Sequence, residues 1–129
     1  MNVVLDTNVL VSALWSAESK PHTILEAVIN RTLTPCHDYR IIEEYCNVLR
    51  RPKFSFNEWE INWLLDAIIR NGISVIPDAL VDISFTDESD RKFYETAKFC
   101  SALLITGNIK HFPCDSCVMT VSEFTEKYL

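Results

Sequence analysis

The hydrophobic positions of this chain fall into two patterns, short apolar runs and longer stripes at helical spacing. Short runs rich in β-branched residues predict strands, because such side chains pack well on a pleated surface. Stripes in which apolar residues recur every three or four positions predict amphipathic helices. These patterns predict strands at 2–5, 33–36, 73–76, 103–105 and 117–119, and helices at 8–15, 21–29, 38–51, 57–70, 86–100 and 122–128.

Helix-breaking and capping residues support these boundaries. Pro21 suits the first turn of a helix, where its missing N–H is not needed, and Pro52 stops the helix before it. Asn57 is a good N-cap, and Asn71-Gly72 is a natural helix end. Because strands and helices alternate, we expect an α/β fold with three α/β/α layers around a central parallel sheet.

Length and composition fit one packed unit. The chain has 129 residues, 48% of them hydrophobic, so we expect a single domain spanning 1–129. Its apolar runs are short, and the stretch 1–15 contains Asp6 and lacks a basic leader, so neither a membrane span nor a signal peptide is expected. The five scattered cysteines suggest free thiols in a reducing compartment, and we expect a cytoplasmic protein.

The net charge of −6 argues mildly against a simple nucleic-acid-binding module, which would carry an excess of Lys and Arg. A nuclease that holds metal ions through carboxylates is a different case. Its active site is expected to be acidic, because the ions supply the positive charge that phosphate needs.

Candidate chemistry lies at the carboxyl ends of predicted strands, where open α/β sheets bind their ligands. Asp6 follows the first strand, although an aspartate there is equally well explained as a helix cap. Thr106-Gly-Asn108 follows another strand, and a turn would explain it too. Asp87 suits a cap, whereas Asp90 shares a helix face with apolar residues and points toward the sheet, which is unusual for an unpartnered carboxylate.

Five segments in this order resemble the PIN-domain family, in particular the small prokaryotic PIN proteins that act as toxins of toxin–antitoxin pairs. The resemblance runs nearly end to end. The segments are Leu5-Asp-Thr-Asn-Val-Leu-Val-Ser12, Ile42-Glu-Glu-Tyr-Cys-Asn-Val-Leu-Arg-Arg-Pro-Lys-Phe54, Asp87-Glu-Ser-Asp-Arg-Lys-Phe93 with Ala97, Ile105-Thr-Gly-Asn-Ile-Lys-His-Phe-Pro113, and Val121-Ser-Glu-Phe124.

This resemblance implies a metal site for Mg²⁺ or Mn²⁺. Its motifs place three acidic, catalytic positions on Asp6, Glu44 and Asp90, and the fourth on Asn108, where family members often have aspartate. An amide oxygen can bind a hard cation but contributes no charge. Asp87 is a weaker candidate that would act through a water.

Three further assignments around this site rest on the same resemblance. Asn8 and Thr106 would not bind the metal themselves but would orient the side chains that do. Helical spacing alone does not decide between Glu43 and Glu44; only the resemblance favours Glu44.

The implied activity is hydrolysis of RNA phosphodiester bonds by a metal-dependent endoribonuclease. The resemblance also implies an antitoxin protein as partner and a homodimer. The residues that could contact RNA phosphates are cationic and follow the third helix or the last motif: Arg50, Arg51, Lys53, Lys110 and His111. A helix terminus explains the first group equally well.

Four other interpretations remain open to different degrees. A degenerate PIN domain would bind RNA or a protein partner without cutting, and Asn108 is the feature that leaves this open. A phosphatase of the haloacid dehalogenase type needs aspartate where Asn8 stands. Cys114 and Cys117 form only one pair, which is weak evidence for a zinc or redox site. A stripe on the fourth helix suits a core better than a dimer surface: Trp59, Ile61, Trp63, Leu64 and Ile68.

Overall fold

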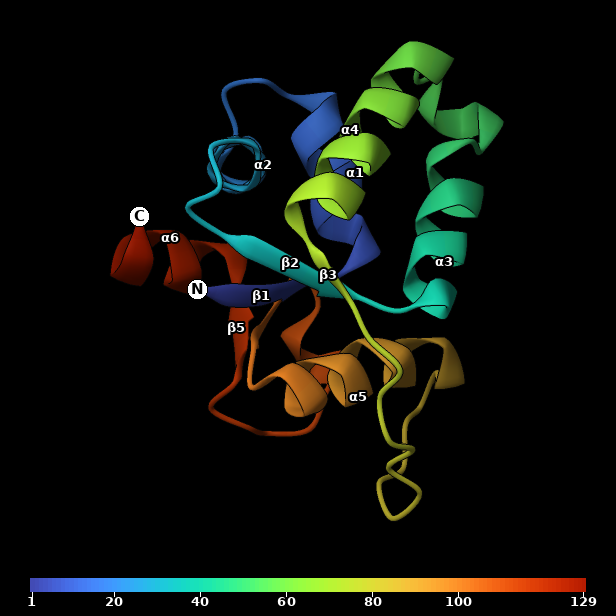
Figure 1. Cartoon of the computed structure of the whole chain (residues 1–129), viewed down its shortest axis with the longest axis vertical. Helices are drawn as coiled ribbons and strands as arrows, with labels where there is room; N and C mark the ends of the chain where they lie inside the picture. The colour runs from blue at the N-terminus through green and yellow to red at the C-terminus, as the bar shows by residue number, and fades with distance from the viewer.

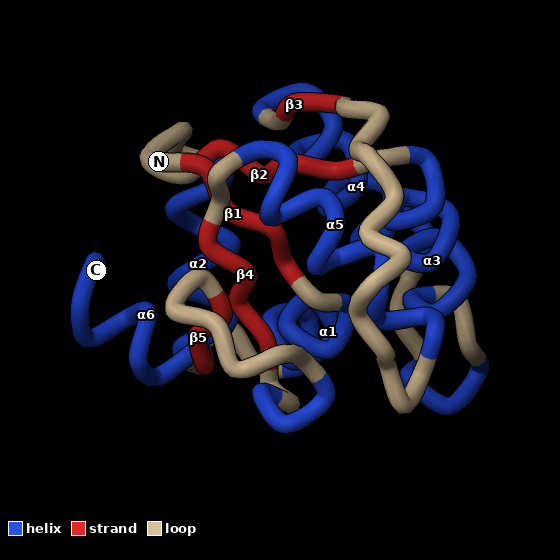
Figure 2. The backbone as a smooth tube through the Cα atoms, turned by 90° about the horizontal axis from the view of Figure 1, so that it is seen from below, coloured by secondary structure: helices blue, strands red, loops and turns tan.

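The computed structural model describes residues 1–129 and contains a five-stranded sheet in the order β3-β2-β1-β4-β5. All neighbouring strands are parallel. Figure 2 shows this order across the sheet. The strands are β1 (Asn2–Leu5), β2 (Thr34–His37), β3 (Ile73–Ser74), β4 (Leu103–Thr106) and β5 (Val118–Thr120).

Helices cover both faces of this sheet. In Figure 1 the helices α1 to α4 lie above the strands and α5 lies below them, while α6 sits beside β5. The helices are α1 (Thr7–Trp15), α2 (Lys20–Ile29), α3 (Tyr39–Leu49), α4 (Glu58–Asn71), α5 (Arg91–Cys100) and α6 (Val121–Tyr128), with short 3-10 turns η1 (Pro52–Phe54), η2 (Glu88–Asp90) and η3 (Ile109–His111). The expected three-layer α/β/α fold with a parallel sheet is confirmed.

Side-chain caps fix where several helices begin. The Ser19 hydroxyl accepts from the N–H of His22, and the Asp38 carboxylate accepts from the N–H of Ile41 at 2.9 Å. Asn57 and Glu60 form a capping box at the start of α4. Each cap satisfies N–H groups that the helix itself leaves unpaired, which is why these polar residues set the boundaries.

The core lies on both sides of the central strands. Residues 3–5 of β1 and 104–105 of β4 are almost completely buried, as expected for parallel strands covered on both faces. Tyr45, Phe93 and Phe124 are among the largest fully buried side chains, and they come from the layers above and below. No helix is both long and apolar enough to span a bilayer.

Two expectations from the sequence are wrong. The strand predicted at 73–76 is shortened to Ile73–Ser74, and the side chain of Ile76 is 89% exposed. This run lies at the edge of the sheet and leads into the loop 75–87, which projects below α5 in Figure 1. On α4, Ile61, Leu64 and Ile68 are buried, but Trp59 and Trp63 are 70% and 46% exposed and so do not belong to the core.

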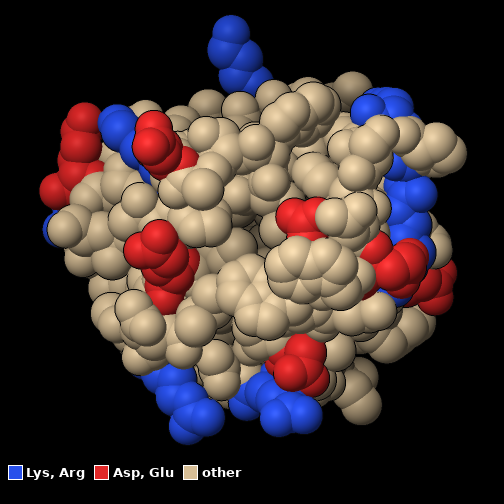
Figure 3. Space-filling model, turned by 90° about the horizontal axis from the view of Figure 1, so that it is seen from above, with Lys and Arg blue, Asp and Glu red and all other residues tan.

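In Figure 3, the face seen from above carries Lys, Arg, Asp and Glu side chains scattered among uncharged surface.

The strand order places the site. β1 lies between β2 and β4, and Leu5 pairs in register with Ile105. The chain segments that follow β1 and β4 therefore leave the sheet at the same level, near the start of α5 and beside α3 (Figure 1).

Candidate functional site

Asp6 lies where β1 ends and caps α1. Its carboxylate accepts hydrogen bonds from the N–H of Thr7 at 2.8 Å, the hydroxyl of Thr106 at 2.7 Å and the amide of Asn8 at 3.3 Å. The side chain is buried, and burial raises the pKa of Asp6 to about 6. The hydrogen bond from Thr106 opposes this increase, and the negative charges of Asp90 and Glu44 add to it.

The turn after β4 is tied to the same carboxylate. The N–H of Asn108 donates to the Thr106 hydroxyl at 2.9 Å, and the N–H of Gly107 donates to the side-chain oxygen of Asn8 at 3.0 Å. A Cβ on Gly107 would lie 3.3 Å from that oxygen, so the close approach favours glycine. Asn8 and Thr106 thus both hold Asp6 in place, and Asn108 stands beside them with an exposed side chain.

Glu44 reaches this cluster from α3. The hydroxyl of Thr7 donates to one carboxylate oxygen, and the ammonium of Lys92 lies 2.7 Å from the other. Glu43 points elsewhere: its side chain is exposed and lines a neighbouring cleft. The structure therefore separates two glutamates that helical spacing could not, and brings Glu44 to Asp6.

Asp90 approaches from the start of α5. Its Oδ2 atom is buried and has no hydrogen-bond donor, and the Nδ1 atom of the His111 ring lies 3.5 Å from it. Burial raises the pKa of Asp90, and the charge of Asp87 adds to this increase. Asp87 itself is exposed and accepts from the N–H and hydroxyl of Ser89, which is the expected capping role.

These residues supply the oxygen ligands that a hard divalent cation prefers, but most of their oxygens already contact other groups of the protein. No three Asp, Glu, His or Cys side chains are arranged to hold an ion as they stand. Thr106 and Thr7 occupy oxygens of Asp6 and Glu44, and Lys92 neutralises Glu44. The orphaned Oδ2 of Asp90 is the atom that fits an ion directly, since a buried carboxylate oxygen without a donor is otherwise costly.

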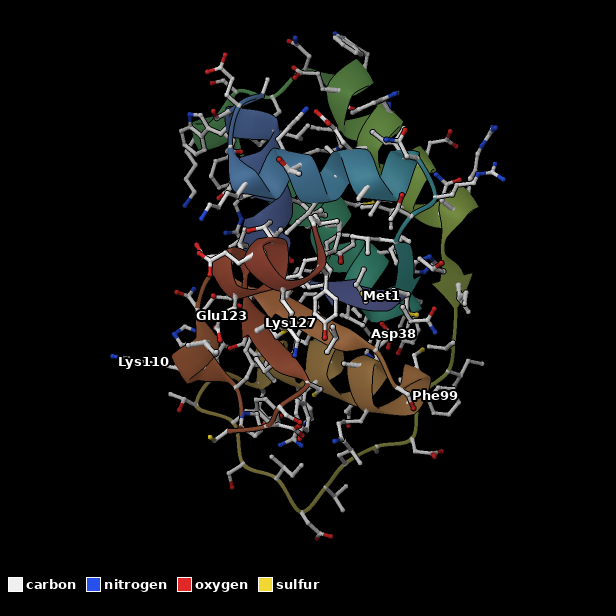
Figure 4. All side chains as sticks on the ribbon, turned by 90° about the vertical axis from the view of Figure 1, so that its left-hand side faces the viewer. Met1, Asp38, Phe99, Lys110, Glu123 and Lys127 are labelled. Atoms are coloured by element: carbon white, nitrogen blue, oxygen red, sulfur yellow. The ribbon has the colours of Figure 1, made fainter.

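The cations named from the sequence have different surroundings. The Arg50 guanidinium is fixed by Glu58 at 2.8 Å and also donates to Asn62, and Lys53 lies over the Phe54 ring. Arg51 has no ion pair and lines the cleft beside Glu44. Lys110 extends into solvent on η3, away from the body of the molecule (Figure 4).

Lys92 is the site residue that the sequence did not reveal. It stands two positions after Asp90 on α5, where a lysine usually faces solvent, yet its side chain is only 11% exposed. The available signal was a lysine two positions after a motif aspartate. The structure gives no support for a zinc site at Cys114 and Cys117, because Cys114 is exposed and no group of three possible ligands includes it.

Comparison with known proteins finds a family model, a relative and solved structures that this chain resembles. A family model described as a PIN domain matches residues 2–110. The uncharacterised protein MJ1680 of Methanocaldococcus jannaschii is 29% identical over 111 residues, which is 84% of this chain and 71% of that protein. A chain in the crystal structure of VapBC2 from Rickettsia felis, bound to a DNA fragment from their promoter, superposes with a TM-score of 0.60 at 18% identity, covering 93% of this chain and 97% of that chain.

Proposed function

Because this chain belongs to the PIN-domain family, we propose that it is a metal-dependent endoribonuclease that hydrolyses RNA phosphodiester bonds. The observation that carries the proposal is the convergence of Asp6, Glu44 and Asp90, from three different elements, on one acidic site, in which Asp6 is buried and the other two carboxylates are partly buried. Burying like charges together is unfavourable unless a cation binds there.

The residues divide the work in a simple way. Asp6, Glu44 and Asp90 would hold Mg²⁺ or Mn²⁺, with the side chain of Asn108 as a neutral fourth ligand and Asp87 acting through a water. A bound divalent ion activates water and offsets charge on the phosphate. Thr106 and Asn8 fix the orientation of Asp6, and Thr7 fixes Glu44. To bind an ion through Glu44, the protein has to release Lys92 from it.

From the family and the fold we also propose the domain extent, cellular location, biological role and partners of the protein. The chain would act as one domain over residues 1–129, in the cytoplasm, as the toxin of a toxin–antitoxin pair with an antitoxin protein as partner. The structural likeness to a chain of VapBC2 is consistent with that role. A homodimer is also part of this proposal, and the exposed Trp59 and Trp63 are available for such a contact.

The experiment is cleavage of a mixed single-stranded RNA pool in Mn²⁺, Mg²⁺ or EDTA. We expect cutting with either metal and none with EDTA. Asp6→Asn should abolish cutting and remain folded, because it removes a buried charge from a crowded acidic site. Asp66→Asn is the matched control, since it removes the same charge from the exposed face of α4 and should cut normally.

A second candidate function is a PIN domain that binds RNA or a protein partner without catalysis. It is favoured by two observations, the amide at Asn108 and the Lys92 ammonium already paired with Glu44. Equal cutting by the wild type and Asp6→Asn, or no cutting with any metal, would replace the nuclease with this binding function.

A further inference from the structure

A cleft opens beside the acidic site, between α3 and the segment that leads into α5. Its volume is about 580 Å³, and Glu44 and Lys92 lie in its wall, so the cleft and the acidic site share an edge. This volume is within the range of pockets that hold a small organic ligand. A molecule bound through a phosphate at the acidic site would therefore extend into the cleft.

Most charges in the cleft wall are already paired. Arg40 binds Asp38 and Glu95, at 2.7 and 2.9 Å. Arg91 binds Glu88 at 2.7 Å, and Lys92 binds Glu44. These pairs leave the wall close to neutral.

Four polar side chains of the wall make no hydrogen bond or ion pair within the protein: Tyr39, Glu43, Asn47 and Arg51. They stand four positions apart, so they form one row along α3 and its end. The Tyr39 side chain is 77% exposed, and the other three are also exposed. The row combines an aromatic ring, a carboxylate, an amide and a guanidinium, all free to bind a ligand.

This set matches the parts of a nucleotide. An exposed aromatic ring stacks on a base, and a guanidinium binds a phosphate. Arg51 lies seven residues beyond Glu44, which is about 10 Å along a helix, so it can reach a phosphate next to the one at the acidic site. Single-stranded RNA is read at its exposed base edges, and Glu43 with Asn47 can provide such contacts.

We propose that this cleft is a subsite for the two nucleotides of single-stranded RNA that flank the phosphate held at the acidic site. The choice of RNA as the ligand rests on the proposed nuclease function. Tyr39 stacks on the base, and Arg51 binds the neighbouring phosphate. Glu43 only accepts hydrogen bonds, so the subsite favours guanine, whose Watson–Crick edge presents two adjacent donors.

The first test measures RNA binding without cleavage. The probe is a fluorescein-labelled single-stranded RNA of about ten nucleotides, titrated in EDTA and followed by anisotropy, with a gel showing that it stays intact. Tyr39→Ala should weaken binding on the order of tenfold, whereas Tyr39→Phe should bind like the wild type. Arg51→Gln should weaken binding and reduce the salt dependence by about 0.7 in the logarithmic slope.

The control variant is Arg31→Gln. Arg31 is an exposed arginine without an ion pair, and it lies between α2 and β2, at the opposite end of the strands. It changes the net charge by the same amount as Arg51→Gln. If Arg31→Gln and Arg51→Gln weaken binding equally, the effect is general electrostatics and the subsite is wrong.

The second test addresses base preference. Oligouridine probes carry one central guanine, adenine or cytosine, and the affinity of each is compared. The wild type should prefer the guanine probe, and Glu43→Gln should lose this preference while still binding oligouridine. Equal affinities of the wild type for all three probes would overturn the assignment of Glu43.

These measurements separate the subsite from the nuclease. Weaker binding by Tyr39→Ala and Arg51→Gln, in a protein that cuts nothing, would support the subsite and reject the nuclease. Normal binding by both variants, in a protein that cuts RNA with metal, would reject the subsite and keep the nuclease. A wild type that does not bind the probe in EDTA also overturns the subsite.

Discussion

Lys92 places a positive charge inside the acidic site. Its ammonium lies 2.7 Å from Glu44 and donates to the carbonyl oxygen of Ser89. Two like charges a few Å apart repel each other by on the order of 1–4 kcal/mol, depending on the local dielectric. A divalent ion therefore competes with Lys92 for Glu44 and is repelled by it.

We predict that Lys92→Gln binds Mn²⁺ more tightly than the wild type, by about tenfold or more. Calorimetric titration of Mn²⁺ into the protein without RNA measures this directly. Lys98→Gln is the matched control, because Lys98 is on the same helix but pairs with Asp115 and is more exposed. Weaker binding by Lys92→Gln would mean that the lysine holds Glu44 in its binding position.

Single residues also show where prediction from the sequence ends. Asp6 and Thr106 could be located, because each directly follows an apolar run that forms a central strand. Arg50 and Arg51 are adjacent and look alike in the sequence. Only the packing of α4 distinguishes them, since it brings Glu58 to Arg50 and leaves Arg51 free.

At the scale of elements, the helices and the central strands were predictable because burial and local pattern agree. The row of apolar residues in α3 faces the core, as the sequence indicated, and the structure adds Asp38 as the N-cap. The apolar run at 73–76 predicted too long a strand, because the length of an edge strand depends on how many of its residues pair with the neighbouring strand. β2 pairs with β3 only at Cys36 and His37.

The end of β2 supplies a prediction about pH. His37 is buried, and neither ring nitrogen makes a hydrogen bond of normal geometry, although the nearby Ile68 backbone weakly favours the protonated ring. Burial lowers the pKa of His37 below its ordinary value of 6.5, so the folded protein keeps the ring neutral. The unfolded chain therefore takes up the proton first. The stability that depends on neutral His37 is lost as the pH falls below about 6.5.

We expect the urea midpoint of the wild type to fall more than that of His37→Leu between about pH 7.5 and pH 5.5. Asp6 acts in the opposite direction, because its pKa is raised to about 6 and the folded state gains stability as it takes up a proton. That gain is common to both proteins and cancels in the comparison. Parallel pH profiles would show that His37 finds a proton acceptor in the fold.

At the scale of the whole molecule, the topology explains why the site is invisible as a single motif. Residues 6, 44, 90 and 108 are spread over most of the chain, and they meet because the strand order places β1 between β2 and β4. The net charge of −6 adds repulsion to this arrangement. A cation that binds only the folded state removes part of that repulsion and shifts the folding equilibrium by mass action.

Mn²⁺ should therefore stabilise the entire fold. At a concentration about one hundred times the dissociation constant, bound metal adds about 2.7 kcal/mol, which raises the melting temperature of a chain of this length by roughly 10 °C. A thermal scan with Mn²⁺ and with EDTA measures the difference. Asp66→Asn should keep the shift and Asp6→Asn should lose most of it, because only Asp6 lies in the acidic site. A shift of equal size in both variants would place the stabilising ion somewhere else on the surface, and the absence of any shift at millimolar Mn²⁺ would leave the carboxylates bound to Lys92 and the threonines, as they are in this structure.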